Sequence, residues 1–385
     1  MDINVRKIVN LILALMVMIG LSACREMPQI QAEERLFPQI SLEYLDKYEI
    51  PSQIFQETPI GGLSAITYDR KKDRFYALSD DRSQRSPARF YTLKIDISSN
   101  DEQITKIQGV TVENVTPLQD EAGQNYSPQT IDPEGIALSP RGTLFISSEG
   151  IPKKEINPFI GEFNPTTGQL QQQIRLPQKY LIPTDPESEP RGVEENLGFE
   201  PLTISATSTV KDDPFRLFTA TEGSLKQDTP TTPPTNIPVR LLHYVISPVG
   251  SPVIVAEHLY LLDKSPKGAI SNGLTELLAL PNEGSWLSLE RTFGLFGNGA
   301  KLFQVVNSGA SDTSTILSFQ QGTETIKPLR KKLLLDLETL EIDLDNLEGM
   351  TFGPRFADGS QTLFLVSDDN FNAEQTTQLL LFRLS

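Results

Sequence analysis

Short stretches that alternate apolar and polar residues, separated by turns, recur along this chain at a nearly constant spacing. The clearest copy is Glu348–Asn370, in which Glu-Gly opens an apolar segment that turns and runs back into a second one ending in Ser-Asp-Asp. Looser copies start at Gly61, Glu134, Glu200 and Glu276. Alternation of this kind predicts β-strands. The recurrence of one strand-turn-strand unit predicts a repeat architecture.

The five units differ in how many strands they supply. The first predicts four, over Gly62–Tyr68, Arg74–Leu78, Arg89–Ile97 and Thr105–Val115, and the next three units repeat this number. The fifth supplies only three, whereas Ile40–Ile50 is a spare strand ahead of the first unit. A propeller exposes no sheet edge when its two ends pair within one blade. The sequence therefore predicts an all-β β-propeller of five four-stranded blades closed by the N-terminal strand, or of six blades if one unit hides a weak sheet.

The N-terminus has the pattern of a targeting segment. Arg6 and Lys7 precede the apolar run Ile8–Ile19, which is short for a membrane-spanning helix, and Leu21-Ser22-Ala23-Cys24 follows. This tetrapeptide resembles a bacterial lipobox, which implies cleavage before Cys24 and lipidation of its thiol. The alternative is an ordinary signal peptide with an incidental cysteine. We expect a lipoprotein signal peptide over residues 1–23, a lipidated Cys24 and tether over 24–38, and the propeller domain over 39–385.

The acidic composition narrows the expected partners. The chain has 34 Lys and Arg against 50 Asp and Glu, a formal net charge of −16 at pH 7. Such a surface disfavours nucleic acid and anionic lipid and favours metal cations or basic ligands. Cys24 is the only cysteine, so no disulfide is expected. We expect a monomer on the extracytoplasmic side of the cell envelope, in contact with the membrane through its lipid anchor only.

Propeller geometry gathers many of the acids at one mouth of the central channel, because first strands begin and second strands end at the same rim. At least nine carboxylates meeting there would repel by about 1–4 kcal/mol for each close pair. Hard divalent cations such as Ca²⁺ are the simplest way to offset this repulsion. Alternatively, the acids cap strand ends, or Arg82 and Arg291 neutralise them. The acids expected at the rim are Glu134, Glu200, Glu276 and Glu348 on first strands and Asp80, Glu149, Glu222, Glu290 and Asp368 on second strands.

Other common chemistries find little support in the sequence. The two histidines, His243 and His258, fall in predicted outer strands, which disfavours a zinc triad or a histidine base at the mouth. The chain has no Gly-x-Ser-x-Gly elbow and no phosphate-binding or dinucleotide-binding glycine fingerprint.

The repeated motifs resemble the bacterial family called esterase-like activity of phytase, or phytase-like domain. The matching words are GGLSAITYD with RFYALSDDR, DPEGIALSPRGTLFISSEG, GFEPLTIS with LFTATEG, LTELLALPNEGSWLSLERTF, and NLEGMTFGP with LFLVSDDNF. They cover roughly residues 58–385. The resemblance implies an exported β-propeller that hydrolyses a small-molecule phosphate ester or carboxyl ester with the help of calcium. In propeller phytases, carboxylates hold calcium ions that bind phosphate and activate a water.

Carried over by position, the resemblance implies roles for particular residues. Arg291, with Lys153 or Lys226 on mouth loops, would hold phosphate. Two departures stand out, because propeller phytases have six blades and the mouth here is poor in basic residues. A non-catalytic propeller that binds a ligand or partner protein at the cell envelope is the alternative function. The implied metal ligands are Asp80, Asp81, Glu134, Glu200, Glu290, Glu348, Asp368 and Asp369, and the implied catalytic residues are Glu149, Glu222 and Arg291, with Glu149 and Glu222 also serving as ligands.

Overall fold

A computed structural model describes residues 36–99, 105–185, 187–206, 208, 210–229, 236–295 and 297–385. Residues Gln39–Ser385 form one compact unit, separate from the N-terminal unit Met1–Pro38. The predicted signal peptide and Cys24 lie outside the described residues. Within the described part of the chain, no helix has the length and apolar character needed to cross a membrane.

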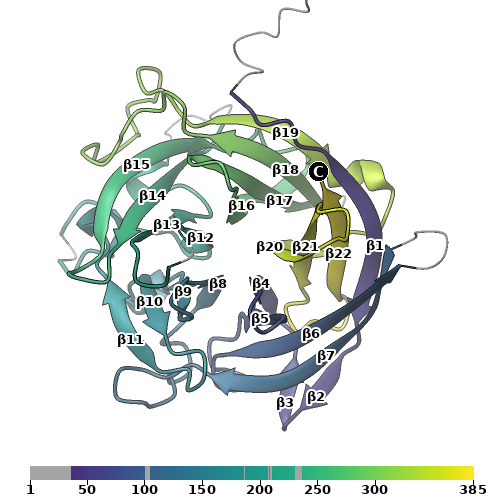
Figure 1. Ribbon diagram of the computed structural model, residues 1–385. Coiled ribbons are helices and arrows are strands. Elements are labelled where there is room, and N and C mark those ends of the chain that lie inside the picture. The colour runs from purple at the N-terminus through teal and green to yellow at the C-terminus, as the bar shows by residue number, and fades with distance from the viewer. Residues whose placement is uncertain are drawn as a thin grey trace, which may run out of the picture. The chain divides into compact units, whose positions relative to one another are not determined.

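The unit Gln39–Ser385 is a five-bladed β-propeller, and each blade is an antiparallel four-stranded sheet (Figure 1). The first four blades use consecutive strands, ordered from the centre outwards. Blade one has β4 (Leu63–Asp69), β5 (Arg74–Ser79), β6 (Arg89–Ser99) and β7 (Thr105–Pro117), and blade two has β8 (Pro133–Leu138), β9 (Leu144–Ser148), β10 (Phe159–Phe163) and β11 (Leu170–Ile174). Blade three has β12 (Phe199–Ala206), β13 (Phe215–Thr221), β14 (Pro238–Ile246) and β15 (Val253–Leu261). Blade four has β16 (Ala269–Ala279), β17 (Ser285–Gly294), β18 (Gly297–Val306) and β19 (Arg330–Asp336).

Blade five closes the ring with strands from both ends of the unit. It contains β20 (Asn346–Arg355), β21 (Gln361–Asp368), β22 (Thr377–Leu384) and, outermost, β1 (Leu42–Ile50). β1 runs antiparallel to β22, with Leu42 opposite Leu384 and Ile50 opposite Thr377. The inner strands β4, β8, β12, β16 and β20 contact one another in a closed cycle around the centre. The predicted fold, blade number and closure by the N-terminal strand are therefore confirmed.

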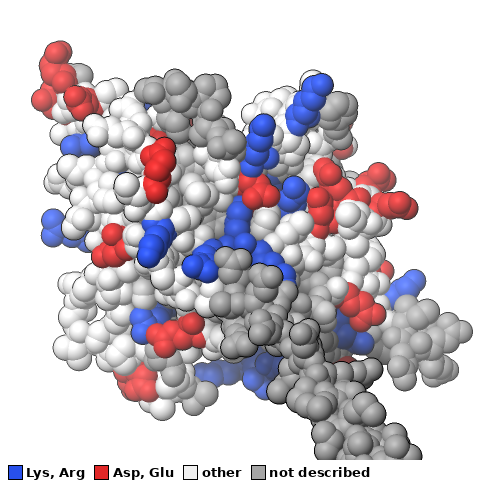
Figure 2. Space-filling view, turned by 90° about the horizontal axis from the view of Figure 1, so that it is seen from above, with Lys and Arg blue, Asp and Glu red and all other residues white. Residues whose placement is uncertain are grey.

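The hydrophobic core lies between neighbouring blades. Apolar side chains that alternate along each strand meet those of the next blade, as Leu78 and Ile146 do between blades one and two. Between blades three and four, the rings of Phe218 and Trp286 pack edge to face with centroids 4.9 Å apart. Charged residues of both signs are interspersed on the outer face shown in Figure 2. The apolar alternation therefore fills the gaps between blades and leaves polar residues for the centre and the surface.

Two details depart from the pattern expected from the sequence. A short hairpin, β2 (Gln53–Phe55) and β3 (Thr58–Ile60), precedes blade one. The first two strands of blade four, β16 and β17, are longer than predicted, so that Glu276 and Glu290 fall inside strands instead of at their ends. A four-residue 3₁₀-helix, Leu337–Leu340, follows β19.

Candidate active site in the central pocket

Each inner strand carries a β-bulge at the same level of the propeller. In blade one Leu63 pairs with Ser79 and Ala65 with Leu78, so Ser64 is left without an opposite residue. A bulge bends its strand and turns the extra side chain. The register shifts equivalently in the other four blades. The residues at these bulges, here called the bulge ring, are Ser64, Glu134, Glu200, Thr275 and Glu348.

Glycines next to the bulge ring let neighbouring blades approach closely. A Cβ on Gly135 would lie 2.2 Å from the carbonyl oxygen of Glu200, and a Cβ on Gly349 would lie 2.8 Å from the Cα of Ala65. Only glycine fits such a distance between backbones. The repeated Glu-Gly motif thus has two physical causes. The bulge turns the carboxylate, and the glycine lets the backbone of the next blade approach closely.

A second set of charged residues comes from the second strand of each blade. Each lies one residue after the position that pairs with the residue before the bulge. Ser79, Ser148, Thr221, Glu290 and Ser367 lie opposite the residues before the bulges. The following residues therefore occupy equivalent places in the five blades. This set, here called the second-strand ring, is Asp80, Glu149, Glu222, Arg291 and Asp368. Four of its members are acids, and blade four supplies an arginine in the fifth place.

The two rings open into one central pocket of about 470 Å³. Three acids of the bulge ring and all five residues of the second-strand ring line it, together with Arg82 and amide side chains such as Asn196, Asn346 and Asn370. This volume suits a small-molecule ligand. The predicted convergence at one mouth is therefore found for Asp80, Glu134, Glu149, Glu200, Glu222, Arg291, Glu348 and Asp368.

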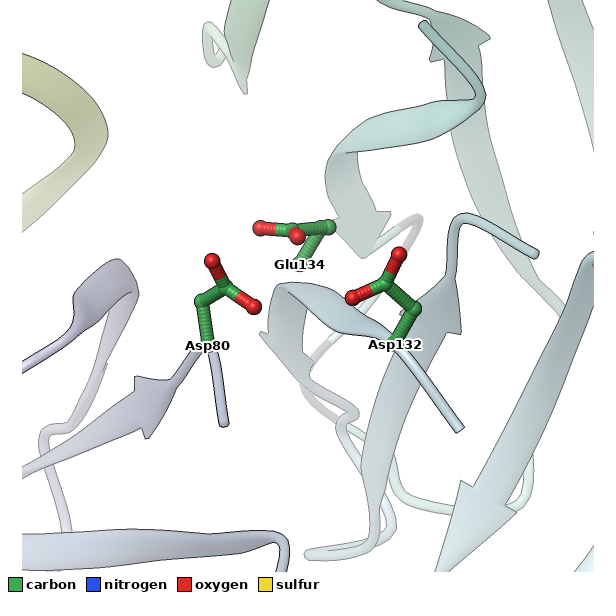
Figure 3. Close-up of side chains that lie close together, drawn as sticks. All are labelled: Asp80, Asp132 and Glu134. Atoms are coloured by element: carbon green, nitrogen blue, oxygen red, sulfur yellow. The ribbon is translucent and has the colours of Figure 1, made fainter. Parts of the chain in front are cut away.

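Two groups of carboxylates within the pocket are close enough to share a cation, and Glu134 belongs to both. In the first, one oxygen each from Asp80, Asp132 and Glu134 lie within 4.8 Å of one another, and the three side chains point toward a common point (Figure 3). In the second, Glu134, Glu200 and Glu348 satisfy the same distance. Both groups present only carboxylate oxygens, which are the ligands that hard divalent cations prefer.

The carboxylates of the pocket lack enough positive charge within the protein. Burial raises the pKa of Asp80 to about 8, and the charges of Asp132 and Glu348 act in the same direction. Burial also raises the pKa of Glu222 to about 7, although the guanidinium of Arg291 opposes it. Burial and neighbouring carboxylates raise the pKa values of Glu134, Glu149, Glu200 and Asp368 well above the ordinary range. These shifts all express the same shortage of counter-charge.

Two buried carboxylate oxygens, one in the central pocket and one beside it, accept no hydrogen bond from an N–H or O–H donor of the described residues. They are Oδ2 of Asp132 and Oε2 of Glu200. A buried acceptor without a partner is costly, so it points to a ligand that supplies the missing interaction. The oxygen-only donor set and these two free oxygens together fit a divalent cation.

The two arginines of the pocket are committed to its acids. The Arg291 guanidinium lies 3.2 Å from Oε1 of Glu222 and 3.3 Å from Oε1 of Glu348. Arg82 donates from Nε to Oδ1 of Asp132 at 2.6 Å. Each arginine therefore neutralises part of one side of the pocket.

Four acids that the sequence assigned to the mouth or to its metal ions lie elsewhere. For Glu276 and Glu290, the strand register explains the difference. Glu276 and Glu290 sit one position away from the ring residues Thr275 and Arg291, and a shift of one residue turns a side chain to the other face of a strand. Oε1 of Glu276 accepts hydrogen bonds from the backbone N–H groups of Leu202 and Leu277. The interpretation of Glu276 and Glu290 as rim acids was therefore wrong, and we correct the blade-four positions to Thr275 and Arg291.

Glu290 has protein partners for both of its carboxylate oxygens. Oε1 accepts from the hydroxyl of Tyr260 at 2.6 Å and pairs with Lys331, and Oε2 accepts from the N–H of Asp263 at 3.0 Å. Glu290 and these partners do not line the central pocket. They occupy the oxygens that metal binding would need.

Asp81 and Asp369, the second acids of the two Asp-Asp pairs, also lie outside the central pocket. Their predecessors Asp80 and Asp368 line it, and successive residues of an extended chain point to opposite sides. The carboxylate of Asp81 accepts from three backbone N–H groups and from Arg89. The resemblance implied that all four acids bind metal, whereas in the structure one acid of each pair lines the pocket and the other anchors a loop.

The sequence interpretation missed Asp132 and Asn346. Asp132 precedes β8 and completes the carboxylate group of Figure 3. Asn346 donates from Nδ2 to Oε1 of Glu348 at 2.7 Å. Both stand two residues before a bulge glutamate, in the words Asp-Pro-Glu and Asn-Leu-Glu. That shared offset was the available signal.

The sequence matches one protein family over most of its length. Residues 58–371 match the family model "Phytase-like", described as esterase-like activity of phytase. No similar protein was found among curated proteins.

Solved structures resemble this chain only distantly. An endo-arabinase from Bacteroides thetaiotaomicron is 12% identical, with a TM-score of 0.38 over 83% of this chain and 93% of that one. A GH62 α-L-arabinofuranosidase catalytic domain from Coprinopsis cinerea is 12% identical, with a TM-score of 0.39 over 90% and 97%. A putative 6-phosphogluconolactonase from Bacteroides uniformis is 11% identical, with a TM-score of 0.30 over 80% and 83%. At these scores the likeness carries no argument about activity.

Proposed function

The chain belongs to the phytase-like family, described as esterase-like activity of phytase, and from this premise we propose that it is a metal-dependent hydrolase of small-molecule phosphate or carboxyl esters. The central pocket is the proposed active site. The cation proposed there is calcium, which tolerates irregular sites built from many carboxylates.

The observation that supports this proposal best is the group of incompletely satisfied carboxylates in and beside the central pocket. Asp80, Asp132, Glu134, Glu200 and Glu348 would hold the cation, and Asp132 and Glu200 each keep a buried oxygen free of protein partners. Structural acids in this chain, such as Glu290, have partners on both oxygens. The free oxygens therefore distinguish the pocket from the acids that only hold the fold together.

The side chains around the metal group have separable roles in ester hydrolysis. A bound calcium would supply Lewis-acid chemistry, polarising the ester and making a nearby water more acidic. Glu222 and Glu149 lie on the second-strand ring, where either can take the proton of the attacking water. The pKa of Glu222, raised to about 7, lies near the operating pH that suits a general base. Arg291, which pairs with Glu222, would add positive charge that offsets the negative charge developing on the substrate.

The cellular placement of this activity is part of the same proposal. We propose lipidation at Cys24 and a position on the extracytoplasmic side of the cell envelope, supported by the lipobox-like word Leu21-Ser22-Ala23-Cys24. Radiolabelled palmitate supplied to expressing bacteria should label the wild-type chain, and Cys24→Ala should abolish the label. Labelling that persists in Cys24→Ala would remove this part of the proposal.

The activity can be tested with the purified full-length chain and two generic substrates, nitrophenyl phosphate and nitrophenyl acetate. We expect calcium-dependent release of nitrophenol from at least one, and loss of release in chelator. Glu200→Gln should lower the calcium-dependent rate by about 100-fold or more, since it removes a proposed metal ligand. Glu283→Gln is the matched control, because Glu283 is an exposed acid that pairs with Arg216 at the surface.

The same experiment separates hydrolysis from binding alone. Calcium that raises the melting temperature of the wild type but not of Glu200→Gln, with no turnover of either ester, would favour a non-catalytic propeller with a metal-bearing mouth. Turnover that is indifferent to chelator would contradict the metal-dependent mechanism.

A further inference from the structure

A side pocket of about 240 Å³ adjoins the central pocket beside blade one. The two pockets share the lining residues Asp80, Arg82, Asn196 and Asn370, so a ligand can extend from one into the other. The side pocket adds Asp81, Gln84, Arg85 and Phe371, which the central pocket lacks. Asp81 is paired with the buried Arg89, so the side pocket is a branch of the proposed active site to which Arg85 adds a positive charge without an acidic partner among the described residues.

Arg85 differs from the other two arginines around the site because its charge is not spent on an acid. Arg82 pairs with Asp132, and Arg291 with Glu222 and Glu348. Among the described residues, the Arg85 side chain has no ion pair. Its guanidinium instead lies 4.7 Å from the centre of the Phe371 ring. Stacking on an aromatic face leaves the N–H groups at the guanidinium edge free to bind a carboxylate or phosphate.

Hydrogen bonds to the Asp81 carboxylate fix the loop that carries Arg85. The Asp81 carboxylate accepts the N–H groups of Gln84 at 2.7 Å, Arg85 at 3.1 Å and Ser86 at 3.0 Å. It also accepts from Nη1 of Arg89 at 2.8 Å. These bonds hold the backbone of Arg85 in place, so an anion that binds its side chain does not have to order the loop.

The aromatic partner of Arg85 is held in an unfavourable backbone conformation. Phe371 has φ of 50°, in the left-handed region that bulky residues avoid at a cost of about 1–3 kcal/mol. Asp369 secures it by accepting the N–H of Phe371 at 2.9 Å and that of Gly62 at 2.8 Å. The ring lies against Gly62, where a Cβ would come within 2.4 Å of it. These contacts hold the ring beside the guanidinium of Arg85 and, at 5.7 Å from the ring centre, that of Arg89.

We propose that Arg85, stacked on Phe371, is an anion-binding residue that recognises an acidic group of the substrate other than the ester that is cleaved. The substrate class is then an ester, of phosphoric or carboxylic acid, that bears a further phosphate or carboxylate. This inference rests on the proposed function, since the cleaved ester lies in the adjoining central pocket. The guanidinium fork matches both anions, and its charge-assisted hydrogen bonds are stronger than neutral ones.

Binding of simple anions tests the role of Arg85 without any turnover. Inorganic phosphate and, separately, acetate are titrated calorimetrically into the full-length chain in calcium buffer. We expect Arg85→Ala to weaken phosphate or acetate binding by about tenfold or more, and Phe371→Leu, which removes the stacking, to weaken it less. The stronger of the two wild-type affinities identifies phosphate or carboxylate as the group recognised. Arg70→Ala, which removes the same charge from an exposed turn between β4 and β5, should change the affinity less than about twofold.

A second arm connects the anion site to hydrolysis. Nitrophenyl acetate is compared with the mono-nitrophenyl ester of succinic acid, which carries a free carboxylate. Arg85→Ala should raise KM about tenfold for the succinate ester alone, with kcat kept, because it removes binding shared by the ground state and the transition state. If wild type turns over neither these esters nor nitrophenyl phosphate, the proposed function fails while the phosphate titration still decides the role of Arg85. Equal anion affinity in wild type and Arg85→Ala, or no anion binding by wild type, overturns the inference.

Discussion

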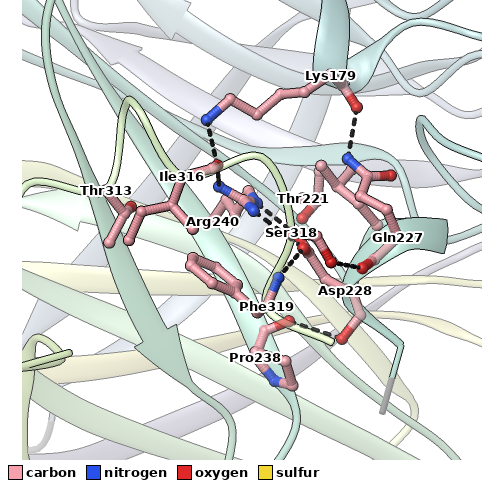
Figure 4. Close-up of polar contacts among 12 residues, drawn as sticks. Lys179, Thr221, Gln227, Asp228, Pro238, Arg240, Thr313, Ile316, Ser318 and Phe319 are labelled. Atoms are coloured by element: carbon pink, nitrogen blue, oxygen red, sulfur yellow. Dashed lines mark hydrogen bonds and ion pairs between the residues drawn. The ribbon is translucent and has the colours of Figure 1, made fainter. Parts of the chain in front are cut away.

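Two regions of the described chain that bury several charged side chains differ in how well those charges are matched. In the first region, Arg240 pairs with Asp228 and Glu257, and Lys179 pairs with Glu257. Figure 4 shows Arg240, Lys179 and Asp228 of this group. Arg240 donates to Oδ2 of Asp228 at 2.5 Å and to Oε1 of Glu257 at 2.6 Å. Tyr180 donates to the other Glu257 oxygen at 2.7 Å. Every carboxylate oxygen of this Arg240 network has a donor within the protein.

The Arg240 network has an evident structural task. Asp228 accepts the N–H of Phe319, and Lys179 donates to the carbonyl oxygens of Ser314 and Ile316. These partners belong to the long connection between β18 and β19, which is thereby fastened to blade three. The guanidinium of Arg240 also stacks 3.8 Å from the centre of the Phe319 ring. The matched charges hold an irregular segment in place.

The central pocket gathers more acids and leaves them unmatched. Only Arg82 and Arg291 oppose them, and oxygens of Asp132 and Glu200 have no donor among the described residues. Burying charge without partners lowers stability, so a fold retains it only where something else depends on it. The contrast shows that burial of acids alone does not indicate a functional site, whereas buried acids without hydrogen-bond or charge partners do.

Removing Arg240 should break the matched region most severely. Arg240→Met leaves Asp228 and Glu257 buried without their main cation, and we expect a loss of about 3–5 kcal/mol in the free energy of unfolding. Urea unfolding followed by tryptophan fluorescence measures it. The control is Arg216→Met, whose partner Glu283 is largely exposed, with an expected loss of no more than about 1 kcal/mol. Equal losses in the two variants would contradict the comparison.

The unmatched region should make the calcium-free protein less stable as pH rises. The pKa of Asp80 is about 8 in the folded chain and about 3.8 without burial, so between these values the folded state binds more protons than the unfolded state. Stability is then greatest at low pH and is lost as pH rises towards 8. Asp80 alone should lower the free energy of unfolding by about 2–3 kcal/mol between pH 6 and pH 8. Urea midpoints in chelator would show this fall, and calcium should reduce it. A stability that rises with pH in this window would refute the shortage of counter-charge.

Neutralising one acid should have opposite effects in the two regions. In chelator at pH 8, Glu200→Gln removes a buried carboxyl that lacks a partner, and we expect a gain of about 1–2 kcal/mol. Glu257→Gln removes an acid that has four cationic or hydroxyl donors, and it should destabilise the chain. Thermal melts with and without calcium separate the cases, because calcium should stabilise Glu257→Gln but not Glu200→Gln. A loss of stability in both variants would mean that the pocket acids are structural.

The fold was predictable because its signal is repeated. Alternating apolar residues and turns recur in five units, and the unit that lacks a strand is complemented by Ile40–Ile50, close to the observed β1. The rule that exposed sheet edges are avoided then indicates closure by the N-terminal strand. The hairpin β2–β3 occurs once and has no repeat to reveal it.

For the site, the sequence could predict only which acidic positions recur in the repeats. In blade four, Thr275 and Arg291 occupy the ring positions. In the sequence, however, the neighbouring Glu276 and Glu290 are the residues whose type matches the acids of the other repeats. Register depends on bulges, and a bulge shifts every later side chain by one position. Whether Asp81 faces a cation or a loop depends in the same way on local backbone direction. These choices are made by pairing between strands, which a single sequence does not display.

The pairing of β1 with β22 sets the order in which this propeller can be completed. Leu42 and Leu384 are neighbours in space although nearly the whole domain separates them along the chain. Contacts between such distant residues close large loops and slow folding. Blades one to four can form from strands that follow one another, whereas blade five waits for Thr377–Leu384. A chain interrupted before that strand presents unpaired edges on both sides of an open gap, and such edges are where strands of other chains pair and aggregation begins.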